Sequence, residues 1–153
     1  MVNLGYACIN IGLTEEGVLS NRGMIRRTFL EKGVQYASQL ALQNVQALLQ
    51  IVQWNAAHGF PVFRVTSELF PWASEYRLED MPDFAEIRSL LEETGRLPVR
   101  LSAHPGPFNK LAGSGPTLSN TIKDLEIHSE VFPLSRNLVF ISERTLITEV
   151  PPD

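Results

Sequence analysis

The sequence has one cysteine, Cys8, and no apolar run long enough to cross a bilayer. A single cysteine excludes an internal disulfide framework and is typical of a reducing compartment, so we expect a cytoplasmic, intracellular protein. The amino terminus lacks a basic segment followed by an apolar one, so we expect neither a signal peptide nor a membrane partner. A small buried strand-end residue is a simpler explanation of Cys8 than a reactive thiol.

Charged residues make up only 20% of the chain, against 44% hydrophobic residues. These proportions are typical of a globular domain, and 153 residues suffice for one domain with a core. The formal net charge of −4 argues against a protein that coats nucleic acid without specificity. It does not exclude a nuclease, whose basic groups can be local and whose metal ions carry positive charge of their own.

Predicted strands and helices alternate along the chain. Short apolar or β-branched runs predict strands at 2–8, 61–67 and 99–103. Apolar periodicity predicts helices at 30–58, 82–93 and 117–131. Gly33 and the small residues at 37–41 allow a bend in the first of them, or two helices rather than one. Residues 11–28 have no sustained period and are expected to form a loop. The connections are too long for hairpins and suit right-handed crossovers in a parallel sheet.

The last predicted helix, 117–131, gives specific expectations about burial. We expect Ile122, Leu125 and Val131 to be buried, and His128, which lies among polar residues, to be on the surface. After Phe132 the pattern changes. The segments 137–142 and 145–150 have the composition of short strands, but no helix separates them.

The stretch that ends the third predicted strand is the most informative. The apolar run Val99 to Ala103 ends at His104, and Pro105, Gly106 and Pro107 then break regular structure. In barrels and open α/β folds, chemistry sits at the carboxyl ends of parallel strands. A neutral imidazole there suits a metal ligand or a general base. Taken alone, a histidine in this place is more often structural than catalytic.

Two further segments allow two interpretations each. The basic residues Arg22, Arg26, Arg27 and Lys32 form either a phosphate-contacting patch or a solvated surface, and charge alone favours the solvated surface. The aromatic loop 68–74 is either a packed lid or a surface on which bases stack.

A series of short motifs resembles the amino-terminal half of the UV damage endonuclease family in order and spacing. The motifs are Leu4–Asn10, Asn21–Arg22, Trp54–Asn55 with His58–Gly59, Phe63–Ser67, Phe70–Ser74, Leu101–Gly106 with Phe108–Asn109, and Lys123–Glu126 with His128. Together they span most of the chain, and their common register makes the resemblance specific.

The resemblance implies a TIM barrel with a cluster of divalent metal ions, usually manganese. It implies a phosphodiester hydrolase that cuts ultraviolet-damaged double-stranded DNA on the 5′ side of the lesion and starts excision repair. The expected fold class is therefore α/β, a partial TIM (β/α) barrel of about three βα units. Residues 1–132 are expected to be the amino-terminal part of that barrel, and residues 133–153 a divergent or truncated tail.

The resemblance also implies roles for individual residues. His104 corresponds to a metal ligand, and no other catalytic residue is identified. The residues implied to contact DNA or the lesion are Tyr6, Asn10, Arg22, Pro107, Phe108 and Asn109. Pro107 and Phe108 correspond to a pair that inserts into the duplex opposite the lesion, although the family commonly has glutamine where this chain has Pro107. The family's later strands carry most of the metal-binding carboxylates and the other histidines, and the chain is expected to lack that carboxyl-terminal half.

Three functions stay open at this stage. The first is a metal-dependent UV damage endonuclease, of which this chain is a portion. The second is a non-catalytic remnant or a fragment that binds DNA without cutting it. The third is another metal-dependent barrel enzyme, such as an abasic-site endonuclease or a sugar isomerase. The aromatic loop at 70–72 and the Pro107-Phe108 pair favour a DNA-lesion reader over a sugar site.

Overall fold

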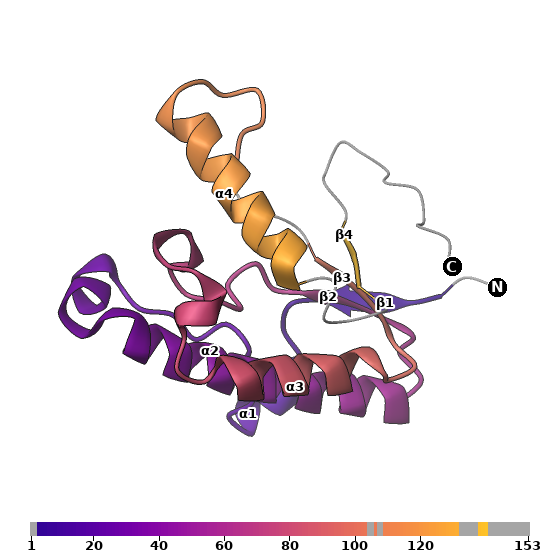
Figure 1. The fold of residues 1–153 in the computed structure, drawn as a ribbon. Helices are drawn as coiled ribbons and strands as arrows, with labels where there is room; N and C mark the ends of the chain where they lie inside the picture. The colour runs from indigo at the N-terminus through magenta and orange to yellow at the C-terminus, as the bar shows by residue number, and fades with distance from the viewer. Residues whose placement is uncertain (1–2, 104–105, 107–108, 132–137, 141–153) are drawn as a thin grey trace.

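A computed structural model describes residues 3–103, 106, 109–131 and 138–140 of the chain (Figure 1). Its strands form one sheet in the order β1-β2-β3-β4, and every pair of neighbours is parallel. The strands are β1 Gly5–Ala7, β2 Val62–Val65, β3 Arg100–Ala103 and β4 Leu138–Phe140. The first three confirm the predicted strands at their cores. β4 lies within the predicted 137–142 segment and adds a further parallel strand.

Helices connect the strands, as the parallel order requires. They are α1 Ile11–Glu15, α2 Arg26–Ala57, the 3-10 turns η1 Ala73–Glu75 and η2 Leu78–Asp80, α3 Phe84–Gly95 and α4 Pro116–Val131. Gly33 interrupts α2 with a φ of 63°, so the first predicted helix is kinked at this glycine, as the sequence allowed. Glycine takes this left-handed conformation without the steric penalty that a side chain would add.

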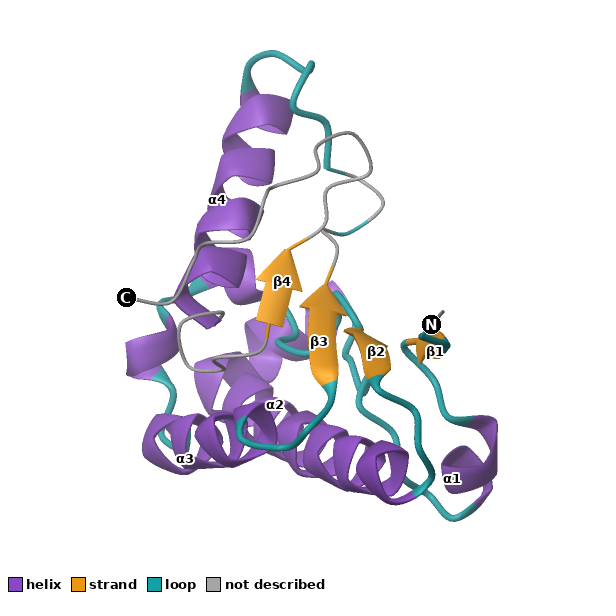
Figure 2. Ribbon diagram, turned by 90° about the vertical axis from the view of Figure 1, so that its right-hand side faces the viewer, coloured by secondary structure: helices purple, strands orange, loops and turns teal. Residues whose placement is uncertain are grey.

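The main core lies between the sheet and the α2–α3 layer, which runs along one face of the sheet (Figures 1 and 2). Strand residues alternate between faces, so Phe63, Val65 and Leu101 point into this core. They meet apolar side chains such as Ile51 from α2 and Ile87 from α3. α4 projects away from the α2–α3 layer, next to β4 (Figure 2).

Three expectations about local structure are wrong. Residues 11–15 form α1 rather than loop, because Asn10 caps the helix by accepting a hydrogen bond from the Leu13 amide. Ile122 is 45% exposed, because the packed face of α4 carries Thr121, Asp124 and His128. The His128 side chain is only 12% exposed and lines a cavity instead of the surface.

The remaining expectations for α4 agree with the structure, since Val131 is buried and Leu125 is partly buried. The segment 145–150 lies outside the described residues. Within the part of the chain that is described, no helix is long and apolar enough to span a membrane.

Candidate functional site

Tyr6 and Asn10, two of the predicted lesion contacts, meet at the carboxyl end of β1. The Tyr6 hydroxyl donates a hydrogen bond to Asn55 Oδ1 on α2, 2.5 Å away, and accepts one from Asn10 Nδ2 at 2.7 Å. The Tyr6 ring packs edge-on against Phe60 and Phe63, which places it on the helix-covered side of the sheet. The structure therefore brings the two residues together, and their contact with a lesion stays a prediction.

Asn55 is a participant in this network that residue-by-residue analysis of the sequence missed. It is fully buried, and its Nδ2 has no hydrogen-bond partner among the described residues. Its Oδ1 accepts the hydrogen bond from the Tyr6 hydroxyl, and this bond anchors the buried side chain to the end of β1. The signal was present in the sequence, since Trp54–Asn55 is one of the motifs of the resemblance.

Arg22 is held by the protein itself. Its guanidinium donates to the backbone carbonyls of Leu19 and Gly17, the latter at 2.9 Å. Its backbone pairs with the buried Asn44 side chain, which accepts from Arg22 N at 2.7 Å and donates to Arg22 O at 2.9 Å. Arg22 thus organises the 17–22 loop, and a contact with DNA stays a prediction.

The rest of the basic cluster lies on the first turns of α2. Arg26 and Arg27 are exposed, and Arg27 pairs with Glu31 at 2.9 Å on the same helix surface. The Lys32 ammonium lies 4.2 Å from the centre of the Tyr36 ring. These contacts are local to the helix and agree with a solvated surface.

The aromatic loop after β2 is packed. Trp72 stacks on Phe29 of α2 with ring centres 5.8 Å apart, and its Nε1 donates to Met24 O at 2.9 Å. The Tyr76 hydroxyl donates to Pro71 O at 2.8 Å, and burial raises the pKa of this phenol. The structure therefore favours the packed interpretation of this loop over a free stacking surface.

Cys8 follows β1 and continues its pairing with β2, because its amide donates to Arg64 O at 2.7 Å. Burial raises the pKa of the Cys8 thiol, and the nearby Arg64 guanidinium opposes part of that rise. A raised pKa keeps the thiol protonated at neutral pH, which lowers its reactivity as a nucleophile. This agrees with the prediction of a strand-end residue.

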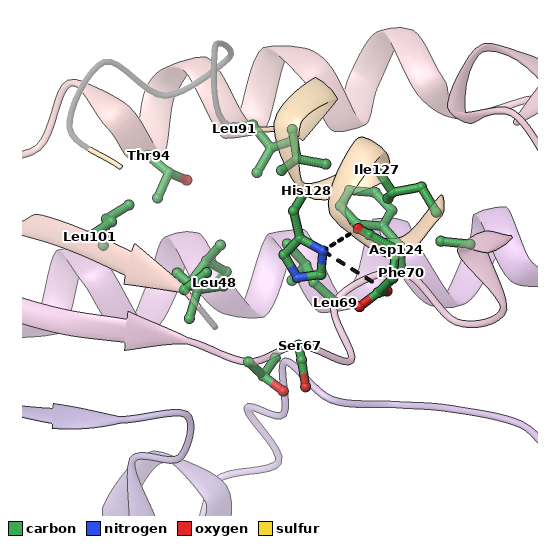
Figure 3. A pocket seen from close by; sticks show the side chains of 15 residues that line it. Leu48, Ser67, Leu69, Phe70, Leu91, Thr94, Leu101, Asp124, Ile127 and His128 are labelled. Atoms are coloured by element: carbon green, nitrogen blue, oxygen red, sulfur yellow. Dashed lines mark hydrogen bonds and ion pairs between the residues drawn. The ribbon is translucent and has the colours of Figure 1, made fainter. Parts of the chain in front are cut away.

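A mainly apolar cavity of about 50 Å³ lies beyond the carboxyl ends of β2 and β3 (Figure 3). Residues of the β2 loop, such as Ser67 and Phe70, form one side of it. Asp124 and His128 of α4 line it next to each other. His128 Nδ1 lies 2.7 Å from Asp124 O and 3.9 Å from Asp124 Oδ1.

Asn109, the last described residue of the predicted lesion-contacting set, joins this group. Its Nδ2 donates to Asp124 Oδ2, and its backbone amide donates to Gly106 O at 3.1 Å. Asp124 was not predicted as a site residue, although it belongs to the Lys123–Glu126 motif. Asn109 is therefore connected to the cavity-lining face of α4.

The predicted metal ligand His104 and the predicted inserting pair, Pro107 and Phe108, lie outside the described residues. Among the residues that the structure does describe, no group of three or more His, Cys, Asp or Glu side chains could hold a metal ion. Asp124 and His128 lie side by side, and within the described part of the chain they do not belong to a group of three. The described side chains thus do not fit a metal centre by themselves.

Residues 2–141 match a family model described as UV-endonuclease UvdE. The chain is 36% identical over 135 residues to the UV-damage endonuclease of Schizosaccharomyces pombe, an alignment that covers 84% of this chain and 22% of that protein. It is 30% identical over 119 residues to the putative UV-damage endonuclease of Acanthamoeba polyphaga mimivirus, covering 74% of this chain and 36% of that protein.

The fold is similar to the crystal structure of SacUVDE. The TM-score is 0.75 at 21% sequence identity, and the match covers 93% of this chain and 49% of that one. The chain thus spans about half of the solved structure and between 22% and 36% of the two relatives above.

Proposed function

Because this chain belongs to the UV-endonuclease UvdE family, we propose that it forms the amino-terminal part of a DNA repair endonuclease. The proposed substrate is ultraviolet-damaged duplex DNA, cut on the 5′ side of the photoproduct by metal-dependent hydrolysis. The observation that supports this most strongly is the family match over residues 2–141, which includes β3 and the His104 that follows it.

We also propose that the sheet is part of a TIM barrel. Its parallel strands follow one another in chain order, and α2 and α3 cover one face. In a barrel each strand pairs with the next along the chain, whereas a doubly wound sheet changes direction. The similar solved structure is about twice the length of this chain, which leaves room for further strands.

Manganese is the proposed cofactor. A divalent metal would supply a nucleophilic hydroxide and neutralise charge on the phosphate that is being cut. His104 is proposed as one ligand, and the other ligands as residues of the family's later strands. The described side chains do not make up a ligand set by themselves.

The chain's own residues are proposed to recognise the lesion. Tyr6 and Asn10 would line the lesion site from the end of β1, and Arg22 and Asn109 would support the surrounding loops. Phe108, with Pro107 before it, would insert into the duplex as an apolar wedge. Insertion costs less free energy where a lesion already weakens stacking and pairing.

A second candidate is a protein that binds damaged DNA without cutting it. The family match supports this candidate too, because an endonuclease for damaged DNA must bind its substrate before it cuts it.

A nicking assay on ultraviolet-irradiated supercoiled plasmid with manganese separates the two candidates. Nicking by the full chain that is lost in His104→Ala supports the endonuclease. Preferential binding of irradiated plasmid without nicking supports the binding protein, provided that circular dichroism shows the preparation to be folded. A folded chain that neither nicks nor prefers irradiated DNA contradicts both candidates, and unirradiated plasmid is the control.

A further inference from the structure

Two side chains on one face of helix α4 form hydrogen bonds with the segment that follows β3. The first is Thr121, which is 1% exposed. Its Oγ1 accepts a hydrogen bond from Lys110 N at 2.9 Å and donates one to Thr117 O at 2.9 Å. The hydroxyl is thus fixed by the helix backbone, and it fixes the Lys110 amide in turn.

The second side chain is Asp124, one helical turn further on. Its Oδ2 accepts from Asn109 Nδ2, and the Asn109 backbone amide donates to Gly106 O at 3.1 Å. That backbone bond brings residues 106 and 109 together, and residues 107 and 108 lie between them in sequence. The two side-chain bonds, Thr121–Lys110 and Asp124–Asn109, are called the α4 contacts below.

Asp124 lies next to His128, one turn further along the same helix. His128 Nδ1 lies 3.9 Å from Asp124 Oδ1, and both side chains line the same cavity (Figure 3). The Asp124 side chain is 31% exposed, and its Oδ2 is the acceptor for the Asn109 amide. A hydrogen bond to a charged acceptor is stronger and more directional than a neutral one.

We infer that Thr121 and Asp124 are positioning residues for damage recognition. They hold Asn109 and Lys110, the two residues that follow the proposed Pro107-Phe108 wedge in the chain, so they fix the point at which the chain leaves that wedge. The Asn109 amide uses one of its two N–H donors on Asp124, so this bond fixes the side chain and leaves the second donor and the oxygen for a contact with DNA. This inference rests on the proposed function.

The two residue types of the Asp124–Asn109 pair can be swapped by mutation. Asn109→Asp places two carboxylates opposite each other, which removes the hydrogen bond and adds repulsion. Combining it with Asp124→Asn restores one amide and one carboxylate with their positions exchanged. For the other contact, Thr121→Val removes the hydroxyl at nearly constant volume, and Thr121→Ser retains it.

The readout is the ratio of dissociation constants for intact duplex and for the same duplex with one thymine dimer. We expect Asn109→Asp and Thr121→Val to lower this ratio about tenfold, as for directly coupled residues. The double exchange and Thr121→Ser should restore most of it. Phe108→Ala shows the ratio expected without the wedge.

Ser38→Ala is the matched control for a loss of stability alone. Ser38 is fully buried and donates to Asp83 Oδ2 at 2.7 Å, so the variant also loses a side-chain hydrogen bond. This bond joins α2 to the start of α3, away from the α4 contacts. Ser38→Ala should lower the unfolding free energy and leave the ratio unchanged.

Hydrogen exchange of the Lys110 amide tests the α4 contacts without DNA. We expect protection in the unmodified chain and in Thr121→Ser, and faster exchange in Thr121→Val. If the unmodified chain does not distinguish damaged from intact duplex, the proposed function fails, and with it the role in recognition. Faster exchange in Thr121→Val would then still support the contacts themselves.

Two results overturn the inference while the proposed function stands. One is a damage preference that is unchanged in Thr121→Val and Asn109→Asp. The other is a loss of preference that the double exchange does not restore and that Ser38→Ala reproduces.

Discussion

The polar side chains that are predicted to contact DNA form hydrogen bonds within the protein wherever the structure describes them. Tyr6, Asn10, Arg22 and Asn109 each donate to or accept from a neighbouring residue. A side chain that is held in place loses less conformational entropy when it binds a ligand. These residues are therefore suited to act from fixed positions, and their bonds within the protein can be tested one at a time.

Tyr6→Phe removes a hydroxyl that serves two partners, Asn55 and Asn10. Asn55 is fully buried, so the variant leaves its Oδ1 without the hydrogen bond from Tyr6, and it leaves Asn10 Nδ2 without its acceptor. We expect the free energy of unfolding to fall by about 1–3 kcal/mol. Urea unfolding followed by circular dichroism measures the change.

Tyr36→Phe is the control for Tyr6→Phe, because the structure shows no hydrogen bond of the Tyr36 hydroxyl to any described residue. It should change stability by less than about 0.5 kcal/mol. Equal stabilities for the two variants, with damage binding lost only in Tyr6→Phe, would contradict a structural role and assign the Tyr6 hydroxyl to DNA.

The sequence predicted the place of some single residues in the fold correctly and of others wrongly. Asn10 and Tyr6 were correctly placed at the end of the first strand, because a strand's end can be located from its apolar run. His128 was wrongly placed on the surface, because its neighbours in sequence are polar. Burial on a helix depends on neighbours three and four positions away, and here Asp124 and Val131 lie on the packed face with His128.

At the scale of elements, long periodic segments were predicted well. The repeat of Val45, Leu48, Val52 and Ala56 identified α2, and all four are buried or partly buried. The five-residue α1 was missed, because it has no room for a period and depends on the Asn10 cap. β4 was only a candidate strand, since its partner, β3, is remote in sequence.

The first strand depends on a close backbone approach at Gly5. A Cβ at this position would lie 2.2 Å from Val62 O and 2.7 Å from Val62 Cβ, atoms of the neighbouring strand β2. Gly5→Ala should therefore disrupt the pairing of β1 with β2 and lower the free energy of unfolding by about 3 kcal/mol. Urea unfolding measures this loss.

Gly23→Ala is the matched control for Gly5→Ala. A Cβ at residue 23 meets no atom within 4 Å, and this glycine is not among those with positive φ. The control variant should keep the stability of the unmodified chain to within about 0.5 kcal/mol. If Gly5→Ala behaved in the same way, the close packing of β1 against Val62 would be wrong.

At the scale of the whole molecule, the aromatic loop joins parts that are distant in sequence. Trp72 and Tyr76 follow β2, yet Trp72 bonds to Met24 and stacks on Phe29 near the start of α2. The sequence could not predict this pairing, because stacking depends on the kinked path of α2 before Gly33. Global unfolding must break these contacts, so the titration of Tyr76 contributes to the stability of the entire chain.

Burial raises the pKa of Tyr76 in the folded chain above its unfolded value of about 10. The folded state therefore retains the phenol proton more strongly, and the resulting stabilisation is complete below pH 10. As the pH rises above 10, the unfolded chain loses the proton first and the stabilisation is lost. We expect the free energy of unfolding to fall by about 1.4 kcal/mol per pH unit in this range from Tyr76 alone.

Urea unfolding between pH 8 and pH 11 measures this dependence in the unmodified chain and in Tyr76→Phe. The variant loses the hydrogen bond to Pro71 O and should be less stable by about 1 kcal/mol at pH 8. The difference should shrink above pH 10, because only the unmodified chain loses the Tyr76 contribution there. The other titrating groups are common to both proteins, so their effects largely cancel. A difference that stays constant to pH 11 would contradict a buried, protonated Tyr76.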